Sequence, residues 1–508
     1  MSFPLFLTAV LISSPPSPSP PVAAARAHVA ARGPAIVRSF AELLEIPCVA
    51  DDLEGTTRTA RWIARAFADR GAEMNVVGRD GVPPVVVGRL DATEAPETAR
   101  TLAVYVHYDG QPVDPTEWTF GPWTPTLATK ALEAGGVARP LPEDGEPIDP
   151  EWRLYARASG DDKAPLVALL AAIDALEAAG LPRRSNLVFL FEGEEEAGSP
   201  HLGDYLDDPR VRPWLDADLW LICDGPCHQS RRPQLVFGVR GITGFELTVY
   251  GASRHLHSGH YGNWAPNPGH RLARLLASMK DDDGRVRVDG FLDGVSPPDE
   301  AVARAAATIP PFEDALRAEL GLKESEAGDA PYLERMLLPS LNVRGLKSAT
   351  VGRTARNVIP TTATASIDVR LVKGQDPAKV RERIRRHVEA RGYLVLDRDP
   401  TDAERLAHAR IAKMTGAGGY RAVQTSLDHP QAEWLIETTR LAAGDDLVLM
   451  PILGGSLPLW LFEEKLGVPL VIVPIANHDD NQHAPDENLR IGNLWYGVEL
   501  MAAIAATE

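Results

Sequence analysis

Histidine and carboxylate side chains recur just after apolar segments of this sequence. They are His107, Asp109, Asp161, Asp162, the run Glu194 to Glu196, Asp224 and His483. Any one of these groups alone is better explained as a helix cap, a turn or a solvated loop. Together they supply the imidazole and carboxylate donors that Zn²⁺ takes in catalytic sites. The set therefore predicts a metal centre, on condition that the fold brings the segments together.

The elements that would position these side chains are predicted from the apolar pattern. Uninterrupted apolar runs occupy residues 85–87, 102–106, 187–191, 219–222 and 468–475. Helical spacing occupies residues 58–68 and 165–179, and Gly180 ends the second helix. Apolar strands that alternate with helices are typical of an α/β fold with a doubly wound, mostly parallel sheet. Such sheets build their sites at the carboxyl ends of the strands.

The middle of the chain has a different pattern. Residues 245–250 and 362–371 alternate between apolar and polar side chains, which predicts a sheet with one solvated face. A charged amphipathic helix follows up to about Arg391, with Asp376 as its N-cap and Pro377 as its first residue. We expect a catalytic α/β domain at 36–238 and 421–508, interrupted by an inserted α+β domain at 239–420.

Composition limits the class of protein. A length of 508 residues favours more than one domain, and a net charge of −18 argues against a nucleic-acid surface. Three cysteines are too few for a disulfide framework and are expected as free thiols. Residues 1–25 combine a short apolar run with small residues, which predicts an export signal, or else a disordered leader on a cytoplasmic protein. The run is too short to span a membrane.

Four sequence motifs make a family resemblance specific. Residues 107–112 match HxDxQP, residues 161–165 match DDKGP except at Ala164, residues 192–199 match EGxEExGS, and residues 483–488 match a C-terminal HxPNE-like motif. In this order they resemble the dinuclear zinc peptidases that include carnosinase, aminoacylase, glutamate carboxypeptidase and succinyl-diaminopimelate desuccinylase. The similarity covers nearly everything after about residue 36, and the long segment 281–338 resembles the dipeptidase-like branch.

The resemblance implies two divalent cations, zinc with manganese or cobalt as alternatives. It implies these ligands: Asp161 bridging both cations, His107 and Asp224 at one, and Glu196 and His483 at the other. It also implies that Glu195 is the general base and that Asp109 orients His107. The reaction would be hydrolysis by a water molecule held between the two cations.

Further residues are implied as substrate contacts. His257 resembles a histidine of the inserted lid domain that reaches across a homodimer to stabilise an oxyanion, with an ordinary loop histidine as the alternative. Arg370 resembles an arginine that binds the substrate carboxylate, with a solvated strand arginine as the alternative. Asn357, Gly455 and Ser456 resemble additional contacts. The chain departs from the family at Gly160, at Ala164 and at Ile452-Leu453, which replaces Arg-Glu.

The expected function is hydrolysis of the amide bond of dipeptides or small peptides. An N-acyl-amino-acid deacylase of the same family is the alternative, and a non-catalytic binding protein on this fold is a remoter one. A serine hydrolase that uses Ser456 is disfavoured because the sequence contains no GxSxG motif.

Overall fold

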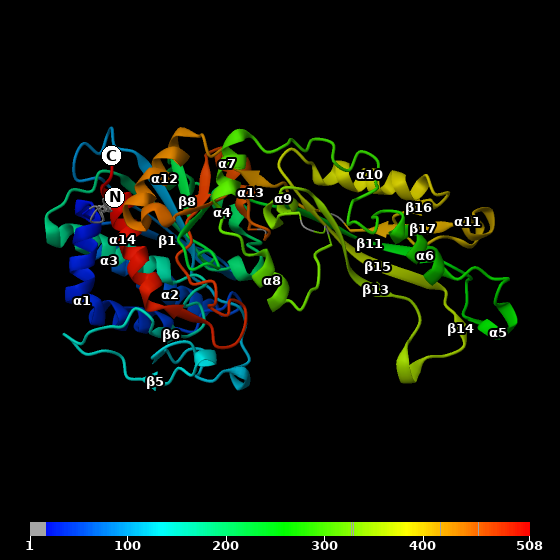
Figure 1. Ribbon diagram of the computed structural model, residues 1–508, viewed down its shortest axis with the longest axis horizontal. Coiled ribbons are helices and arrows are strands. Elements are labelled where there is room, and N and C mark those ends of the chain that lie inside the picture. The colour runs from blue at the N-terminus through cyan, green and yellow to red at the C-terminus, as the bar shows by residue number, and fades with distance from the viewer. Residues whose placement is uncertain (1–16, 327, 329, 417, 456) are drawn as a thin grey trace, which may run out of the picture.

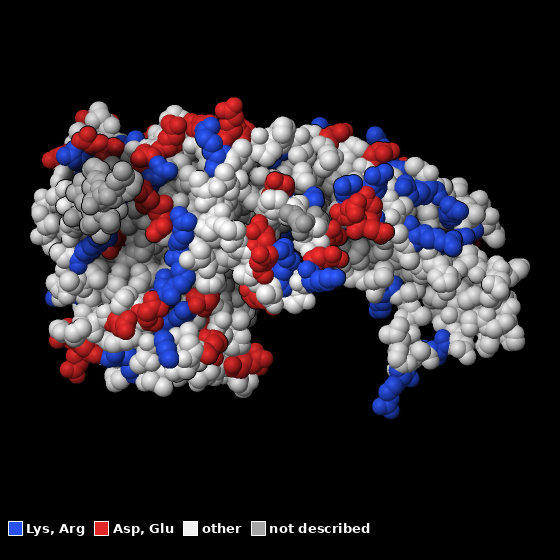
Figure 2. Space-filling model, viewed as in Figure 1, with Lys and Arg blue, Asp and Glu red and all other residues white. Residues whose placement is uncertain are grey.

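The computed structural model describes residues 17–508 apart from 327, 329, 417 and 456. Figure 1 shows two lobes, a larger one that holds both chain ends and an elongated smaller one. The space-filling view in Figure 2 shows the molecule hollowed between them. In the described part of the chain, none of the helices is long and apolar enough to cross a membrane.

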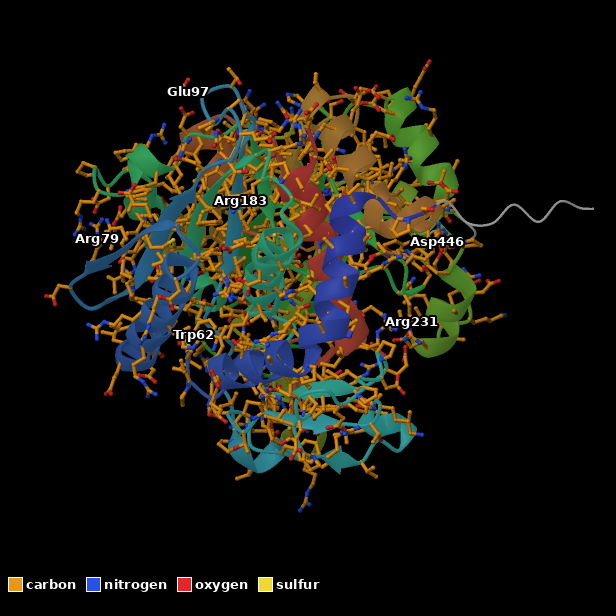
Figure 3. All side chains as sticks on the ribbon, turned by 90° about the vertical axis from the view of Figure 1, so that its left-hand side faces the viewer. Trp62, Arg79, Glu97, Arg183, Arg231 and Asp446 are labelled. Carbon is orange, nitrogen blue, oxygen red and sulfur yellow. The ribbon has the colours of Figure 1, made fainter. Side chains whose placement is uncertain are left out.

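An eight-stranded mixed sheet forms the centre of the larger lobe. Its order is β1 (Glu73–Arg79), β2 (Val82–Leu90), β7 (Asn186–Glu192), β3 (Thr101–His107), β8 (Leu219–Ile222), β20 (Leu470–Ile472), β9 (Gln234–Val236) and β19 (Val448–Met450). The four central strands β7, β3, β8 and β20 are parallel. Their carboxyl ends therefore meet at one edge. In the end-on view of Figure 3, Arg79 marks the β1 side of the lobe and Asp446 the β19 side.

Helices cover both faces of this sheet. They are α1 (Pro20–Leu44), α2 (Leu53–Ala68), α3 (Ala164–Ala179), α12 (Pro430–Ala443) and α14 (Ile491–Ala506) on one face, and α4 (Leu202–Leu206) and α13 (Leu459–Leu466) on the other. Alternate strand residues enter the two apolar cores, for example Val104 on one side and Tyr105 on the other. This arrangement confirms the predicted α/β class.

The predicted stop at Gly180 is confirmed, whereas the cap at Asp52 was not predicted. Asp52 caps α2 by accepting the N–H of Gly55, and Gly180 ends α3 with φ 64°. Helix α3 is apolar on nearly all sides because it lies between the sheet, α1 and α14. Cys48, Cys223 and Cys227 are free and buried, as predicted.

The smaller lobe is built on a five-stranded sheet. Its order is β13 (Ser340–Lys347), β15 (Thr362–Leu371), β11 (Gly241–Tyr250), β17 (Ile411–Thr415) and β16 (Leu394–Leu396). Buried and partly exposed residues alternate along β15, which confirms one solvated face. Helices α6 (Pro268–Ala277) and α10 (Pro377–Glu389) pack on the other face. Asp376 caps α10 by accepting the N–H groups of Ala378 and Lys379, as predicted.

Shorter elements complete the chain. They are the sheet β21–β6–β4–β5 (Asn488–Arg490, Arg153–Tyr155, Thr126–Ala128, Ala138–Arg139), the pairs β12–β14 (Leu256–His257, Val358–Ile359) and β10–β18 (Gly238–Val239, Val423–Gln424), and the helices α5 (Ser258–Tyr261), α7 (Glu300–Thr308), α8 (Glu313–Glu319), α9 (Tyr332–Met336) and α11 (Asp402–Ala407). Helix α7 packs against β19, so part of the predicted insertion contacts the larger lobe.

The predicted N-terminal leader is only partly within the described residues. Residues 1–16, which contain its apolar run, lie outside them. Residues 20–25 form the first turns of α1, where Val22 and Ala25 are buried. The small residues that were interpreted as the end of an export signal therefore belong to the helical layer of the larger lobe.

Candidate metal centre

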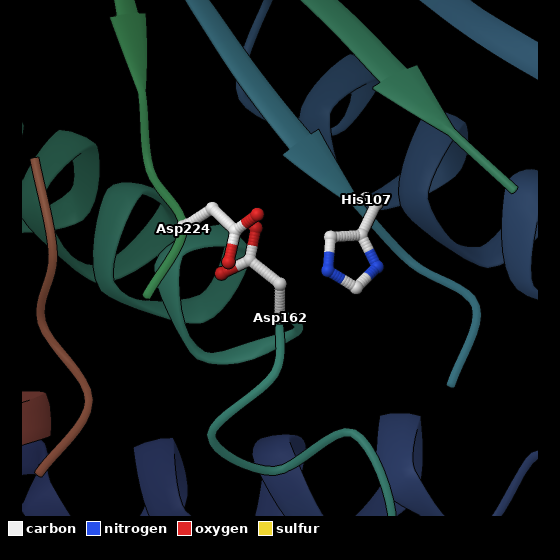
Figure 4. Close-up of side chains that lie close together, drawn as sticks. All are labelled: His107, Asp162 and Asp224. Carbon is white, nitrogen blue, oxygen red and sulfur yellow. The ribbon is translucent and has the colours of Figure 1, made fainter. Parts of the chain in front are cut away.

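The central strands bring the predicted polar residues to one edge of the large sheet. His107 is the last residue of β3, and Asp224 follows β8 by two residues. Beyond β7 the chain forms a short 3-10 turn, η3 (Glu195–Ala197). Figure 4 shows His107, Asp162 and Asp224 facing one another below the strand ends.

Six side chains form two groups that could each hold a cation. One group is His107, Asp162 and Asp224, and the other is Asp161, Glu196 and His483; within each group the donor atoms lie within 4.8 Å of one another. All five side chains expected as ligands are therefore gathered here. Asp162, which was not among them, lies in the first group.

The carboxylate of Asp161 connects the two groups. Its Oδ1 lies 2.8 Å from Nε2 of His107, and its Oδ2 lies 3.1 Å from Nε2 of His483. The same His483 nitrogen is 3.2 Å from Oε2 of Glu196. One carboxylate whose two oxygens face the imidazoles of different groups has the geometry of a ligand shared by two cations.

The electrostatics of the centre suit bound cations. Burial, followed by the repulsion of Asp224, raises the pKa of Asp162. Burial, followed by the repulsion of Asp161, raises the pKa of Asp224. Burial also disfavours the charge of Asp161, but hydrogen bonds to His107 and His483 outweigh it and lower the pKa of Asp161. Oδ2 of Asp162 is buried and has no hydrogen-bond partner among the described residues. Two imidazoles and four carboxylates fit a pair of divalent cations.

Asp109 supports the metal centre through contacts with the backbone of Glu195 and Glu196 and with the ring of His107. Its Oδ1 accepts the N–H of Glu195 and its Oδ2 accepts the N–H of Glu196, both at 3.1 Å. Nδ1 of His107 lies 3.1 Å from the backbone carbonyl of Asp109 and 3.5 Å from its carboxylate. The carbonyl is thus the nearer acceptor for an Nδ1–H of His107, which leaves Nε2 free to bind a cation. The carboxylate of Asp109 chiefly holds the acidic turn.

Glu195 stands beside the ligands. It is the first residue of η3 and is partly buried. Burial, and next the repulsion of Asp224, raises the pKa of Glu195 despite the attraction of His107. A carboxyl group with a raised pKa is suited to accept a proton near neutral pH.

Sequence reasoning did not assign a role to Glu487. This buried carboxylate accepts the N–H groups of Gly160 and Asp161 through Oε1, at 2.9 and 3.0 Å. Its Oε2 accepts the N–H of Ala158 at 2.9 Å and Nη1 of Arg157 at 2.7 Å. Glu487 therefore fixes the loop that carries Asp161. Its place four residues after His483, within the quoted C-terminal motif, was the available signal.

Two glutamines also contact the expected ligands. Nε2 of Gln111 donates to Oε2 of Glu196 at 2.7 Å, and Nε2 of Gln482 donates to Oδ2 of Asp161 at 2.8 Å. Gln111 belongs to the first quoted motif, whereas Gln482 had no sequence signal beyond its neighbour His483.

Comparisons with known proteins agree with this centre. Residues 237–394 match the peptidase dimerisation domain of the M20 family. The Cys-Gly metallodipeptidase DUG1 of Saccharomyces cerevisiae is 26% identical over 437 residues, which cover 83% of this chain and 81% of that relative. The human Beta-Ala-His dipeptidase is 25% identical, over 83% of this chain and 77% of its own length. The M20 family metallo-carboxypeptidase Sso-CP2 from Sulfolobus solfataricus aligns with a TM-score of 0.69 at 27% identity, covering 93% of this chain and 98% of that one.

The chain is thus similar to M20 peptidases over most of its length, and it contains a match to the dimerisation domain of that family. The human carnosine dipeptidase 1 shares the M20 fold, with a TM-score of 0.65 at 22% identity over 96% of this chain and 99% of that one. The predicted architecture, an α/β domain with an inserted dimerisation domain, is therefore confirmed.

Two of the substrate contacts expected of an M20 enzyme lie far from the metal centre within one chain. His257 is exposed in β12, and β12 pairs with β14, which directly follows Asn357. The N–H of Ser258 donates to the carbonyl of Asn357 at 3.0 Å, so the two predicted residues are neighbours. Figure 1 shows β14 and α5 at the far tip of the smaller lobe.

The remaining expected contacts are at the junction of the two lobes or outside the described residues. Arg370 is near the end of β15 closest to the larger lobe, and its Nε lies 3.4 Å from Oδ2 of Asp368. Burial, and next the charge of Arg370, lowers the pKa of the neighbouring Arg240 to about 10. Gly455 is in the bend before α13, and Ser456 lies outside the described residues.

Proposed function

We propose that this chain hydrolyses the amide bond of dipeptides with the help of two divalent cations, zinc in the first instance. The observation that carries the proposal is the pair of donor groups joined by Asp161, with Glu195 beside them. We assign His107, Asp161, Glu196, Asp224 and His483 as the ligands, as the motifs imply.

Each part of the centre has a task in this reaction. When held by these ligands, the cations would lower the pKa of a water molecule to about 7 and would polarise the scissile carbonyl. Glu195 accepts the proton of the attacking water and returns it to the leaving amine. Asp109 holds the backbone of Glu195 and Glu196, which keeps base and ligand at fixed positions.

The similar proteins support the proposed class of substrate. DUG1 and the human Beta-Ala-His dipeptidase are named as dipeptidases, which favours a dipeptide over an N-acyl amino acid. We assign Arg370 to the substrate carboxylate because a guanidinium binds a carboxylate with two parallel hydrogen bonds. The match to a dimerisation domain supports a homodimer. In that dimer, His257 and Asn357 of one chain would contact the substrate at the metal centre of the other chain, because they lie far from the metal centre of their own chain.

The decisive experiment is a panel of dipeptides and N-acetyl amino acids, assayed after chelation and after adding back Zn²⁺, Mn²⁺ or Co²⁺. We expect turnover of dipeptides that disappears with chelator and returns with metal. Faster turnover of N-acetyl amino acids would favour the deacylase. Turnover that persists in chelator would contradict a metal mechanism, and a metal-loaded protein without turnover on the whole panel would be a binding protein.

Export of the chain remains a prediction, because its apolar run lies outside the described residues. Separation of secreted, periplasmic and cytoplasmic fractions of the source cells, with an antibody to the chain, tests it. Detection only in the cytoplasmic fraction would reject export.

A further inference from the structure

Two histidine rings lie in contact at the far tip of the smaller lobe, where Figure 1 shows α5. His257 is the last residue of β12, and His260 follows it by three residues within α5. The ring centroids are 4.5 Å apart, and the ring planes are inclined to each other by 36°. The proposed hydrolysis uses His257 as a contact to the substrate in the other chain of a dimer, but it gives His260 no task.

The backbone next to His257 decides which of its ring nitrogens can meet a substrate. Nδ1 of His257 accepts the N–H of Gly259 at 3.1 Å. A backbone N–H can only donate, so Nδ1 carries no proton and the neutral ring has its proton on Nε2. His257 is exposed, and its Nε2 has no hydrogen-bond partner among the described residues. The ring therefore presents one accessible donor, the Nε2–H group.

The strand pair at this tip fixes the backbone of His257. The residue is paired with Val358 in the ladder of β12 and β14, and the N–H of Ser258 donates to the carbonyl of Asn357 at 3.0 Å. Only the side chain remains to be held, because an exposed imidazole can adopt several rotamers. The hydrogen bond from Gly259 gives the ring one restraint, and contact with the ring of His260 gives it a second.

We propose that His260 is a positioning residue, whose ring holds His257 in the orientation in which Nε2–H meets the developing oxyanion. This inference rests on the proposed function, in which His257 contacts the substrate at the metal centre of the other chain. A donor that is oriented before the reaction stabilises the transition state more than one that must be ordered during it. Because His260 acts by contact and transfers no proton, another flat ring can take its place.

The kinetic test compares His260→Ala and His260→Phe with the wild type, each as the full, metal-loaded chain acting on a dipeptide. We expect His260→Ala to lower kcat about three- to tenfold, the cost of ordering one free side chain. KM should stay nearly the same, since the oxyanion exists only in the transition state. His260→Phe should restore kcat to within about twofold of the wild type, because it restores the ring contact.

His255→Ala is the matched control. His255 is also an exposed histidine of this tip, but it has no ring contact among the described residues. The control should keep the kcat of the wild type. Loss of kcat in His255→Ala as large as in His260→Ala would show that any change at the tip has this effect, and it would overturn the specific role of His260.

Two amide variants test the donor atom. The side-chain nitrogen of glutamine lies at about the distance of Nε2 from the backbone, and that of asparagine at about the distance of Nδ1. We expect His257→Gln to keep a higher kcat than His257→Asn. The reverse order would assign the donor to Nδ1, which contradicts the orientation that His260 is proposed to hold.

A further measurement does not depend on turnover. The N–H of Gly259 is held by Nδ1 of His257, whereas the N–H of Gly262 is held by the carbonyl of Ser258 at 2.8 Å. Hydrogen–deuterium exchange resolved to single amides compares the two groups. We expect His260→Ala to speed exchange at Gly259 and to leave Gly262 unchanged, and His260→Phe to restore the wild-type rate at Gly259.

The outcomes separate this inference from the proposed function. Wild-type kcat in His260→Ala, or failure of His260→Phe to restore kcat, would overturn the positioning role. Faster exchange at both Gly259 and Gly262 would also overturn it, since His260 would then only stabilise α5. If the wild-type chain hydrolyses no dipeptide while Gly259 alone exchanges faster in His260→Ala, the proposed function fails and the hold of His260 on His257 stands.

Discussion

Replacement of Glu487 by Gln tests whether the metal centre depends on a residue that binds no cation. The carboxylate of Glu487 accepts four hydrogen bonds, from the backbone of Ala158, Gly160 and Asp161 and from Arg157. The side-chain oxygen of glutamine can accept two of these hydrogen bonds. Its NH₂ group then lies against the other two donors and cannot accept a hydrogen bond from them. Breaking a buried ion pair in this way costs about 3–5 kcal/mol.

Part of that cost should appear only when the cations are bound. Glu487 holds Asp161, and Asp161 is the carboxylate that joins the two donor groups. Without cations, burial and the repulsion of Asp161 raise the pKa of Glu487 despite the attraction of Arg157, and glutamine relieves the repulsion. We therefore expect Glu487→Gln to reduce the stabilisation by Zn²⁺ more than it reduces the stability of the chelated protein. Each 1.4 kcal/mol lost from cation binding weakens the affinity about tenfold.

The assay is the melting temperature in chelator and in excess Zn²⁺, with metal content from elemental analysis. Glu192→Gln is the matched control, since Glu192 is equally buried but binds Tyr105 instead of the 158–161 loop. We expect this control to keep the full response to Zn²⁺. If Glu487→Gln lowers the melting temperature equally in both conditions and binds two cations with wild-type affinity, Glu487 does not position Asp161.

Three further predictions concern the centre itself. Glu195→Gln should lower kcat about 10²–10⁴-fold with unchanged metal content; substantial remaining activity would reject Glu195 as the base. Asp161→Ala should lose metal from both sites in elemental analysis, and full occupancy would reject the bridging role. In the chelated protein, burial raises the pKa of Asp224, and it raises the pKa of Glu192 to about 8. Below about pH 4 both carboxyl groups are neutral in the folded and in the unfolded protein. As the pH rises toward about 8, they ionise more readily in the unfolded protein, so the folded state loses stability and the melting temperature should fall over this interval. Zn²⁺ added near neutral pH should release protons from Asp224, measurable with a pH indicator, and a melting temperature that rises with pH in chelator would contradict this explanation.

The strand ends were predictable because long apolar runs have few alternatives to buried strands. The predicted run 468–475 became the shorter strand Leu470–Ile472, since Pro469 and Pro474 flank it and have no N–H for the ladder. The antiparallel edge pair of β1 with β2 was not predicted, because β1 is mostly solvent-exposed and lacks an apolar run. Helix α7 packs on the larger lobe although its sequence position is inside the insertion, and no local pattern indicates such long-range packing.

Among the site residues, the types of the donors were visible in the sequence, but their partners were not. The motif that contains Asp109 suggested an orienting carboxylate for His107, and this carboxylate lies 3.5 Å from Nδ1 of His107. The sequence did not indicate that it also accepts the backbone N–H groups of Glu195 and Glu196. Asp162 was part of the predicted donor set but not one of the five expected ligands, yet it lies with His107 and Asp224. Neighbouring residues can point to different partners, and only the backbone conformation of the loop decides which.

The sequence by itself determined the layered α/β fold and the inventory of imidazole and carboxylate donors, because hydrophobic periodicity and residue chemistry are local properties. Only the tertiary structure decided that Asp161 spans two groups, that Glu487 holds its loop, and that His257 and Asn357 stand at the far tip of the smaller lobe. These facts depend on distances between segments that are up to several hundred residues apart in the chain, and such distances are set by the packing of the whole molecule.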